Sequence, residues 1–173
     1  MKHYGPGSEA LEVLLTHSRC VAEKALTVAD RVAHLEPDRL FIKEASMLHD
    51  IGMIHTWAPG IGCRGEYPYI LHGVIGAEML QKEGLRRHAR VCERHTGAGL
   101  SVMEIVEADL PLPHRNLLPD TLEEKIICFA DKFFSKNPTT LTHEKSIAKV
   151  RSLMAQYGDT QLVRFEAMAA LFE

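Results

Sequence analysis

The sequence predicts an all-α protein, a compact helical bundle of six to eight helices. Apolar residues recur at the three-to-four-residue spacing of buried helix faces along most of the chain. The alternating β-branched runs that indicate strands are nearly absent, and helix-start and helix-stop residues punctuate the apolar pattern. A length of 173 residues favours one domain. We therefore expect a single domain over residues 1–173, with its core at 8–136 and C-terminal helices at 140–173.

The first two helices and a long loop are expected in the N-terminal part of the chain. A buried apolar stripe predicts a helix over residues 8–34. A second helix begins near Pro37, because proline suits a first helical turn, and is expected to end at Gly52. Residues 53–71 contain several glycines and prolines, which predicts a long surface loop. Loops of this kind in compact domains are often functional.

Further helices follow the loop. Helices are expected over residues 72–82, 86–94, a short stretch from 101, 121–134, 142–157 and 160–171. Capping-box spacing occurs twice, at Ser101 with Glu104 and at Thr121 with Glu124, and predicts a helix start at each place. The last helix has an apolar face that either packs internally or forms a homodimer contact; it comprises Leu162, Phe165, Met168, Ala169 and Phe172.

Composition excludes several classes of protein. Hydrophobic residues make up 46% and charged residues 25%, as in ordinary globular proteins. The net charge of −3 argues against a long nucleic acid as partner. No apolar run could span a bilayer and no signal peptide precedes the first helix, so we expect a cytoplasmic protein with no membrane partner. The four cysteines are scattered, which favours free thiols over disulfides or a thiolate zinc site.

Histidines supply the strongest functional signal. The chain has ten, and several lie within apolar helical patterns. His17 lies between core positions of the first helix, His49 and Asp50 end the second, and Asp131 lies among phenylalanines. Buried ionisable groups are costly unless they are paired or bound to a metal. The alternatives are a hydrogen-bonded core histidine, a helix-end pair facing water and a carboxylate with a strong ionic partner.

Two more histidines lie at helix ends. His72 opens one helix and His95 closes another. Alone, His72 is compatible with a surface residue of a first turn, and His95 with a cation at the negative end of a helix dipole. No single position decides between these readings. The decisive feature is the order of six ligand-type residues along the chain: His17, His49, Asp50, His72, His95 and Asp131.

This order resembles the HD phosphohydrolase superfamily, whose pattern is a histidine, a His-Asp doublet and a distal aspartate on separate helices. The sequence around the doublet, Leu48 to Gly52, is similar to that family as well. The histidines His72 and His95 resemble those of the bimetallic subgroup, which includes bacterial di-iron enzymes that split diadenosine tetraphosphate symmetrically. The chain is also similar to small HDIG-type proteins of archaea and bacteria. Met53 stands where cyclic-dinucleotide phosphodiesterases of this superfamily carry lysine, which argues against that substrate.

The resemblance implies a metal centre. One ion would bind His17, His49, Asp50 and Asp131, and a second would bind His72 and His95, with Asp50 bridging the two. His49 and Asp50 would be the catalytic doublet. Imidazole and carboxylate ligands suit two divalent ions such as iron, manganese or another transition metal, and magnesium is also compatible. Open coordination positions would then hold water and substrate oxygens.

The implied reaction is hydrolysis of a phosphoester or phosphoanhydride bond by a metal-activated hydroxide. The expected partner is a phosphorylated small molecule, a nucleotide or dinucleotide. Candidate substrate-binding residues are Arg64, Lys132, Arg94 and His55, since cationic side chains bind phosphate oxygens. The alternative for each is a solvated surface charge or a plain loop histidine. Two other functions stay open: hydrolysis of a non-nucleotide phosphoester, and a non-catalytic sensor that binds metal or nucleotide.

Overall fold

The computed structural model describes residue 5 and residues 7–173, and within them it contains eight α-helices and one small hairpin. The helices are α1 (Glu9–Arg31), α2 (Arg39–Leu48), α3 (His72–Lys82), α4 (Arg86–Arg94), α5 (Val102–Glu107), α6 (Leu122–Asp131), α7 (Ile147–Gln156) and α8 (Asp159–Phe172). The all-α prediction is confirmed. In the described residues, no helix is both long and apolar enough to cross a membrane.

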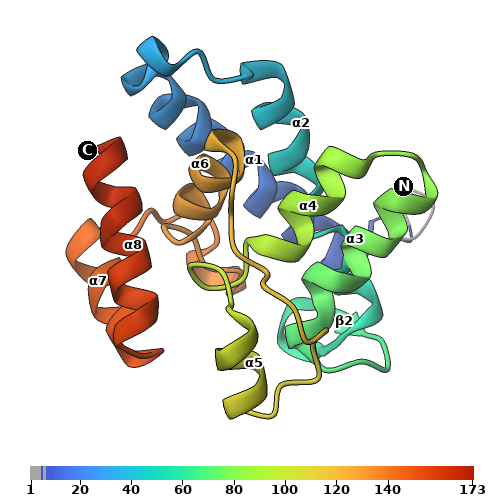
Figure 1. Cartoon of the computed structure of the whole chain (residues 1–173). Helices are drawn as coiled ribbons and strands as arrows, with labels where there is room; N and C mark the ends of the chain where they lie inside the picture. Colours follow the sequence, from blue (N-terminus) through green and yellow to red (C-terminus); the bar gives the residue numbers. More distant parts are fainter. Residues whose placement is uncertain (1–4, 6) are drawn as a thin grey trace.

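Helix α6 lies at the centre of the bundle (Figure 1), where it contacts α1, α2, α4 and α8. Its residues Ile126 to Ala130 are at most 1% exposed, so this helix is buried on nearly all sides. Around it, the main core joins apolar residues of α1, α2, α7 and α8. The polar atoms of Asp131, at the C-terminal end of α6, are thereby held inside the protein.

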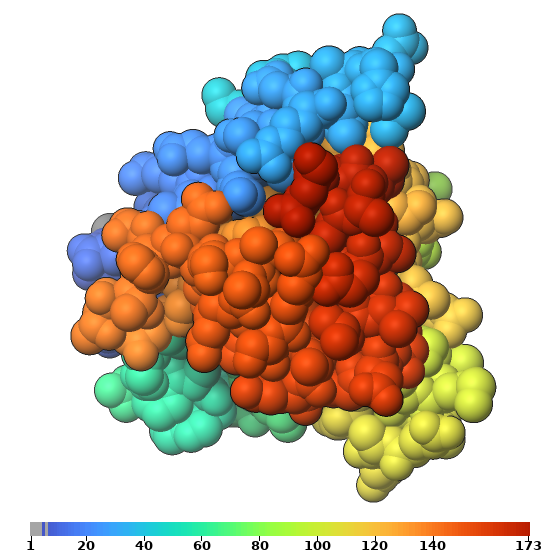
Figure 2. Space-filling view, turned by 90° about the vertical axis from the view of Figure 1, so that its left-hand side faces the viewer, coloured from blue at the N-terminus to red at the C-terminus, as the bar shows by residue number. Residues whose placement is uncertain are grey.

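Helices α7 and α8 pack side by side and cover one face of the molecule, coloured orange to red in Figure 2. The predicted apolar face of the last helix points inward: Phe165, Met168, Ala169 and Phe172 belong to the main core and Leu162 packs against it. Phe165 stacks on Phe129 of α6, with ring centroids 5.3 Å apart. Two roles were predicted for this face, internal packing and a homodimer contact, and in the described structure it packs internally.

Several helix boundaries differ from the prediction. Helix α2 ends at Leu48, four residues before Gly52, and the chain continues as a 3₁₀ helix over Ile51–His55. Just after this helix end, the His49 ring turns back to Ser46, with its Nδ1 2.6 Å from the Ser46 carbonyl oxygen. Helix α6 ends at Asp131 rather than near 134, and α7 begins at Ile147 rather than near 142.

The predicted surface loop over residues 53–71 is more ordered than expected. It contains an antiparallel pair of two-residue strands, β1 (Trp57–Ala58) and β2 (Cys63–Arg64), and 3₁₀ helices at Pro59–Ile61 and Tyr69–Leu71. Cys63, together with Met53, belongs to a second core cluster against the N-terminal half of α1. Part of this segment therefore packs inside the protein, which the glycine and proline content did not indicate.

Both predicted helix starts occur, but only one is a full capping box. At Ser101 the side chain accepts from the Glu104 N–H, and the Glu104 carboxylate accepts from the Ser101 N–H at 2.9 Å. At Thr121 the hydroxyl accepts from the Glu124 N–H. The Glu124 carboxylate instead accepts from the Asp120 N–H at 2.8 Å, and from two arginines of α4. The ion pairs with the two arginines of α4 thus engage the Glu124 carboxylate that a full capping box would use.

The cysteines are free thiols, as predicted.

Candidate metal centre

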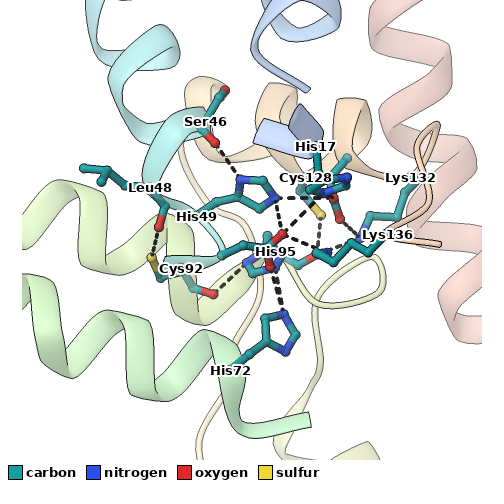
Figure 3. Close-up of polar contacts among 12 residues, drawn as sticks. His17, Ser46, Leu48, His49, His72, Cys92, His95, Cys128, Lys132 and Lys136 are labelled. Atoms are coloured by element: carbon teal, nitrogen blue, oxygen red, sulfur yellow. Dashed lines mark hydrogen bonds and ion pairs between the residues drawn. The ribbon is translucent and has the colours of Figure 1, made fainter. Parts of the chain in front are cut away.

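Six side chains from five separate segments meet near the centre of the molecule (Figure 3). They are the six predicted from the sequence: His17, His49, Asp50, His72, His95 and Asp131. Each is at most 7% exposed. Helix α1 supplies the first, the end of α2 the doublet, the start of α3 and the end of α4 one histidine each, and α6 the last.

The six form two groups that share Asp50. In the first, His17, His49, Asp50 and Asp131 present ligand atoms within 4.8 Å of one another; in the second, Asp50, His72 and His95 do so. His49 Nε2 is 3.0 Å from Asp50 Oδ2. The other oxygen, Asp50 Oδ1, is 3.3 Å from His95 Nε2. The carboxylate of Asp50 thus faces one group with each oxygen.

Backbone carbonyls fix the orientation of three histidine rings. His49, His72 and His95 each place Nδ1 within 2.6–2.7 Å of a carbonyl oxygen three residues earlier. A carbonyl oxygen can only accept, so each Nδ1 carries a proton and each Nε2 is the ring atom that faces the centre. These hydrogen bonds therefore orient the rings so that Nε2 is the atom that would bind a metal.

The centre fits divalent metal ions on two grounds. Asp50 Oδ1 is buried without a hydrogen-bond partner among the described residues, although such a group is costly in a protein interior. In addition, the lone pairs of His72 Nε2 and His95 Nε2 face each other across 3.0 Å. A cation between them would turn this repulsion into coordination. The nitrogen and oxygen donor set suits iron, manganese and similar ions.

Burial and charge set the protonation of the histidines. Burial lowers the pKa of His72 to about 3 and also lowers the pKa of His95, so both rings are neutral at neutral pH. Burial alone would lower the pKa of His49 too, but the carboxylates of Asp50 and Asp131 outweigh it and raise this pKa to about 9. The second group is thereby prepared for a cation, whereas the first holds a proton that a metal ion would displace.

The two aspartates are ionised. Burial by itself would raise the pKa of Asp50, but His49 and Lys136 outweigh it and hold this pKa well below its usual range. Lys132 and Lys136 lower the pKa of Asp131 in the same way against the effect of burial. Two buried carboxylates at full negative charge are what a centre for divalent cations requires.

Of the four predicted substrate-binding residues, one lies at this centre. Lys132 Nζ is 2.6 Å from Asp131 Oδ2 and donates to the His95 carbonyl. Arg94 pairs with Glu124 on the side of α4 that faces α6. Arg64 is exposed on the hairpin and His55 lies at the end of a 3₁₀ helix. Neither these two nor Arg94 are among the residues that line the cavity next to the centre.

Sequence reasoning missed Lys136. Its Nζ is 2.7 Å from Asp50 Oδ2, and its side chain points into the group of ligands (Figure 3). The only local signal was its position five residues after Asp131, beyond the end of α6.

Tyr69, which follows the hairpin, stacks on the His72 ring with centroids 4.7 Å apart. Tyr69 therefore holds the ring of His72, one of the candidate metal ligands, in place.

A cavity of about 880 Å³ adjoins the centre. Asp131, Lys132 and Lys136 line it together with apolar residues of the C-terminal half. This volume lies within the range of roughly 300–1,000 Å³ that is usual for small-molecule sites. A second hollow of about 430 Å³ adjoins Lys136 from the side of Tyr69 and the 3₁₀ helix Pro59–Ile61. A small anionic molecule could thus reach the metal ligands.

Comparison with known proteins agrees with this arrangement. Residues 14–135 match the HD domain family. Over 92% of both chains, the fold is similar to the crystal structure of the HD domain of the L. monocytogenes phosphodiesterase PgpH, with a TM-score of 0.53 and 18% identity. At that identity the likeness shows the fold alone.

Three curated relatives are archaeal. A tRNA (cytidine(56)-2'-O)-methyltransferase of Thermoplasma volcanium is 33% identical over 73% of this chain and 33% of the relative. The enzyme of the same name from Picrophilus torridus is 30% identical over 87% of this chain and 38% of the relative. An uncharacterized protein of Methanocaldococcus jannaschii is 37% identical over 69% of this chain and 65% of the relative. The chain thus spans about a third of the length of the two methyltransferases.

Proposed function

Because this chain belongs to the HD domain family, we propose that it is a metal-dependent phosphohydrolase that cleaves a phosphoester or phosphoanhydride bond of a nucleotide or dinucleotide. The observation that carries the proposal is the sharing of Asp50 between two buried groups of ligands. A carboxylate that faces a separate group with each oxygen is suited to bridge two cations.

The ligand set supports catalysis rather than a purely structural site. The first group offers four protein ligands and the second offers two histidines besides the shared Asp50, so the second ion would keep open positions for water and substrate. Bound divalent ions would supply a water activated for attack and would neutralise phosphoryl charge. His49 and Asp50 are the catalytic doublet of this proposal.

The chain's own residues would bind and orient the phosphoryl group. Lys132 and Lys136 are buried beside Asp131 and Asp50 and line the cavity. Ammonium groups at that place can donate to phosphoryl oxygens and hold them in line with the attacking water.

A metal-dependent activity screen tests the proposal. The protein, depleted of metal and reloaded anaerobically with Mn²⁺, Fe²⁺, Co²⁺ or Ni²⁺, is offered mononucleotides, dinucleotides, sugar phosphates and short RNAs with terminal phosphates. We expect nucleotide hydrolysis that needs added metal and is lost in Asp50→Asn. Hydrolysis that persists after complete chelation contradicts the proposal. Metal binding without turnover of any compound favours the sensor alternative.

A second candidate is hydrolysis of a phosphoester in RNA. The observation in its favour is the similarity to two proteins whose names describe a tRNA methyltransferase, although this chain covers only about a third of each. The RNA arm of the same screen distinguishes it. Cleavage of an RNA end at rates above those for free nucleotides would replace the nucleotide proposal.

A further inference from the structure

The cavity beside the metal centre gathers positive charge from three lysines. Lys132, Lys136 and Lys145 all line it, and Lys145 interacts electrostatically with the other two and with Asp131. Lys132 has an ion pair with Asp131, and Lys136 has one with Asp50. Both carboxylates belong to the metal centre, so cations bound there would compete with these lysines for them. Glu104 and Glu107 also line the cavity, and Glu104 pairs with Arg164. With cations on Asp131 and Asp50, the ammonium groups of the lysines would be available to bind an anion.

Lys145 differs from the other two lysines in its partners. Its Nζ donates to the Lys132 carbonyl at 3.2 Å, and its backbone N–H donates to the Phe133 carbonyl at 2.8 Å. Within the described part of the chain, no ion pair joins Lys145 to a carboxylate; the neighbouring Glu144 pairs with Lys24. Burial lowers the pKa of Lys145. A half-buried ammonium with only carbonyl partners is stabilised by an incoming phosphate oxygen.

Helix α7 supplies an apolar wall of the same cavity. Leu153 and Met154 line it, as does Tyr157, the C-cap residue of α7. Tyr157 is 69% exposed although it is a large aromatic residue. An apolar and aromatic wall suits a flat base better than a hydroxylated sugar alone. Three phosphate-binding cations and an aromatic wall in one cavity match the chemistry of a mononucleotide.

We propose that Lys145 and the cavity-facing side chains of α7 determine substrate specificity, with Lys145 binding a phosphate oxygen and Tyr157 contacting the base. Both lie beyond residue 135, where the match to the HD family ends. This inference rests on the proposed function, because it assigns the cavity to the substrate of the same centre.

Binding measurements on metal-loaded protein test the inference by affinity rather than by turnover, because Lys132 and Lys136 are paired with Asp131 and Asp50 when no cation is bound. Isothermal titration calorimetry compares AMP, ribose 5-phosphate and inorganic phosphate as probes. The first variant is Lys145→Met, and its matched control is Lys149→Met, an exposed lysine of α7 that does not line the cavity. The second variant is Tyr157→Ser, whose control is Tyr67→Ser, an exposed tyrosine of the hairpin region that does not line this cavity. Thermal unfolding of each variant verifies folding.

We expect wild-type protein to bind AMP more tightly than either smaller probe. Loss of one charge-assisted hydrogen bond in Lys145→Met should weaken AMP binding about tenfold or more. Tyr157→Ser should reduce AMP binding to the level of ribose 5-phosphate and leave inorganic phosphate unchanged, and both controls should behave as wild type.

Wild-type affinity for AMP in folded Lys145→Met overturns the inference, as does the absence of AMP binding to wild-type protein. If Lys145→Met fails to fold, unchanged discrimination in Tyr157→Ser overturns it instead. Metal-dependent hydrolysis with wild-type specificity in both variants leaves the proposed function standing and removes this inference alone. AMP binding that depends on Lys145, in a protein without hydrolytic activity, supports the inference and removes the enzyme assignment.

Discussion

The Nε2 atoms of His72 and His95 face each other across 3.0 Å at the start of α3 and the end of α4. In both rings Nδ1 donates to a backbone carbonyl, so the lone pairs of the two Nε2 atoms face each other inside the protein. Helices α3 and α4 are packed closely together, which holds the two rings in position. This relationship is the basis of a second metal position beside Asp50.

Removal of His72 should abolish that position and leave the other. We expect His72→Ala, reconstituted anaerobically with Mn²⁺, to hold one ion per chain where the wild type holds two, since His17, His49, Asp50 and Asp131 remain. Elemental analysis after gel filtration measures this. His114→Ala, an exposed histidine, is the control and should keep two ions. Two ions in His72→Ala would contradict the assignment of the second group.

Metal removal should destabilise the protein. Ions that bind only the folded state stabilise it by about 2.7 kcal/mol when present at 100 times their dissociation constant. We therefore expect a chelator to lower the unfolding temperature by several degrees, measured by calorimetry. Asp50→Asn, which weakens both groups, should respond less to the chelator than wild type does. An equal response in the two proteins would show that the effect does not arise at this centre.

Gly52 allows α3 to pack against the segment that carries His49 and Asp50. A Cβ built at this position would lie 2.2 Å from the His72 carbonyl oxygen and 2.3 Å from the Gly76 nitrogen, both backbone atoms. Gly52→Ala should therefore push α3 and His72 away, cost at least about 3 kcal/mol in the free energy of unfolding, and reduce metal content. Gly60→Ala is the matched control, since no atom lies within 4 Å of its Cβ. Urea denaturation compares the two variants, and equal stability would contradict the prediction.

Gln161 of α8 holds the turn that follows His95. Its amide oxygen accepts from the Ala98 N–H at 2.7 Å, and its amide nitrogen donates to the Gly99 carbonyl at 2.8 Å. Gln161→Leu would leave the buried Ala98 N–H without a partner, at a cost of about 1–3 kcal/mol, whereas Arg164 would still donate to the Gly99 carbonyl. Urea denaturation should detect this loss, whereas Gln156→Leu, an exposed site on α7, should change stability little. An unchanged free energy of unfolding in Gln161→Leu would contradict the prediction.

Glu104 gives the protein an acid-sensitive contact. Burial by itself would raise the pKa of Glu104, but the Arg164 guanidinium and the Ser101 donors outweigh it and lower this pKa to about 2. Because the folded-state pKa lies below the unfolded value, this contribution is fully present above about pH 4.5 and is lost as the pH falls toward 2. The unfolding temperature of metal-depleted wild type should fall more steeply over that interval than that of Glu104→Gln. Parallel curves would exclude this contact as a source of acid sensitivity.

The sequence by itself determined the fold class and the six residues of the candidate metal centre. Helical periodicity and the cap residues located most helices, because these signals act within one or two turns of the chain. His17, His49, Asp50, His72, His95 and Asp131 were recognisable because a buried ionisable group needs a partner wherever it lies. Their common order in a known family then implied that they meet.

Only the tertiary structure decided which cationic side chains lie beside the six residues of the candidate metal centre. Arg94 and Lys136 look equally suitable in the sequence, yet Arg94 pairs with Glu124 whereas Lys136 reaches Asp50. The same competition explains why Glu124, which pairs with Arg90 and Arg94, forms no full capping box. A long cationic side chain can satisfy its charge in many directions. Which carboxylate it meets depends on how distant helices pack, and local sequence does not encode that geometry.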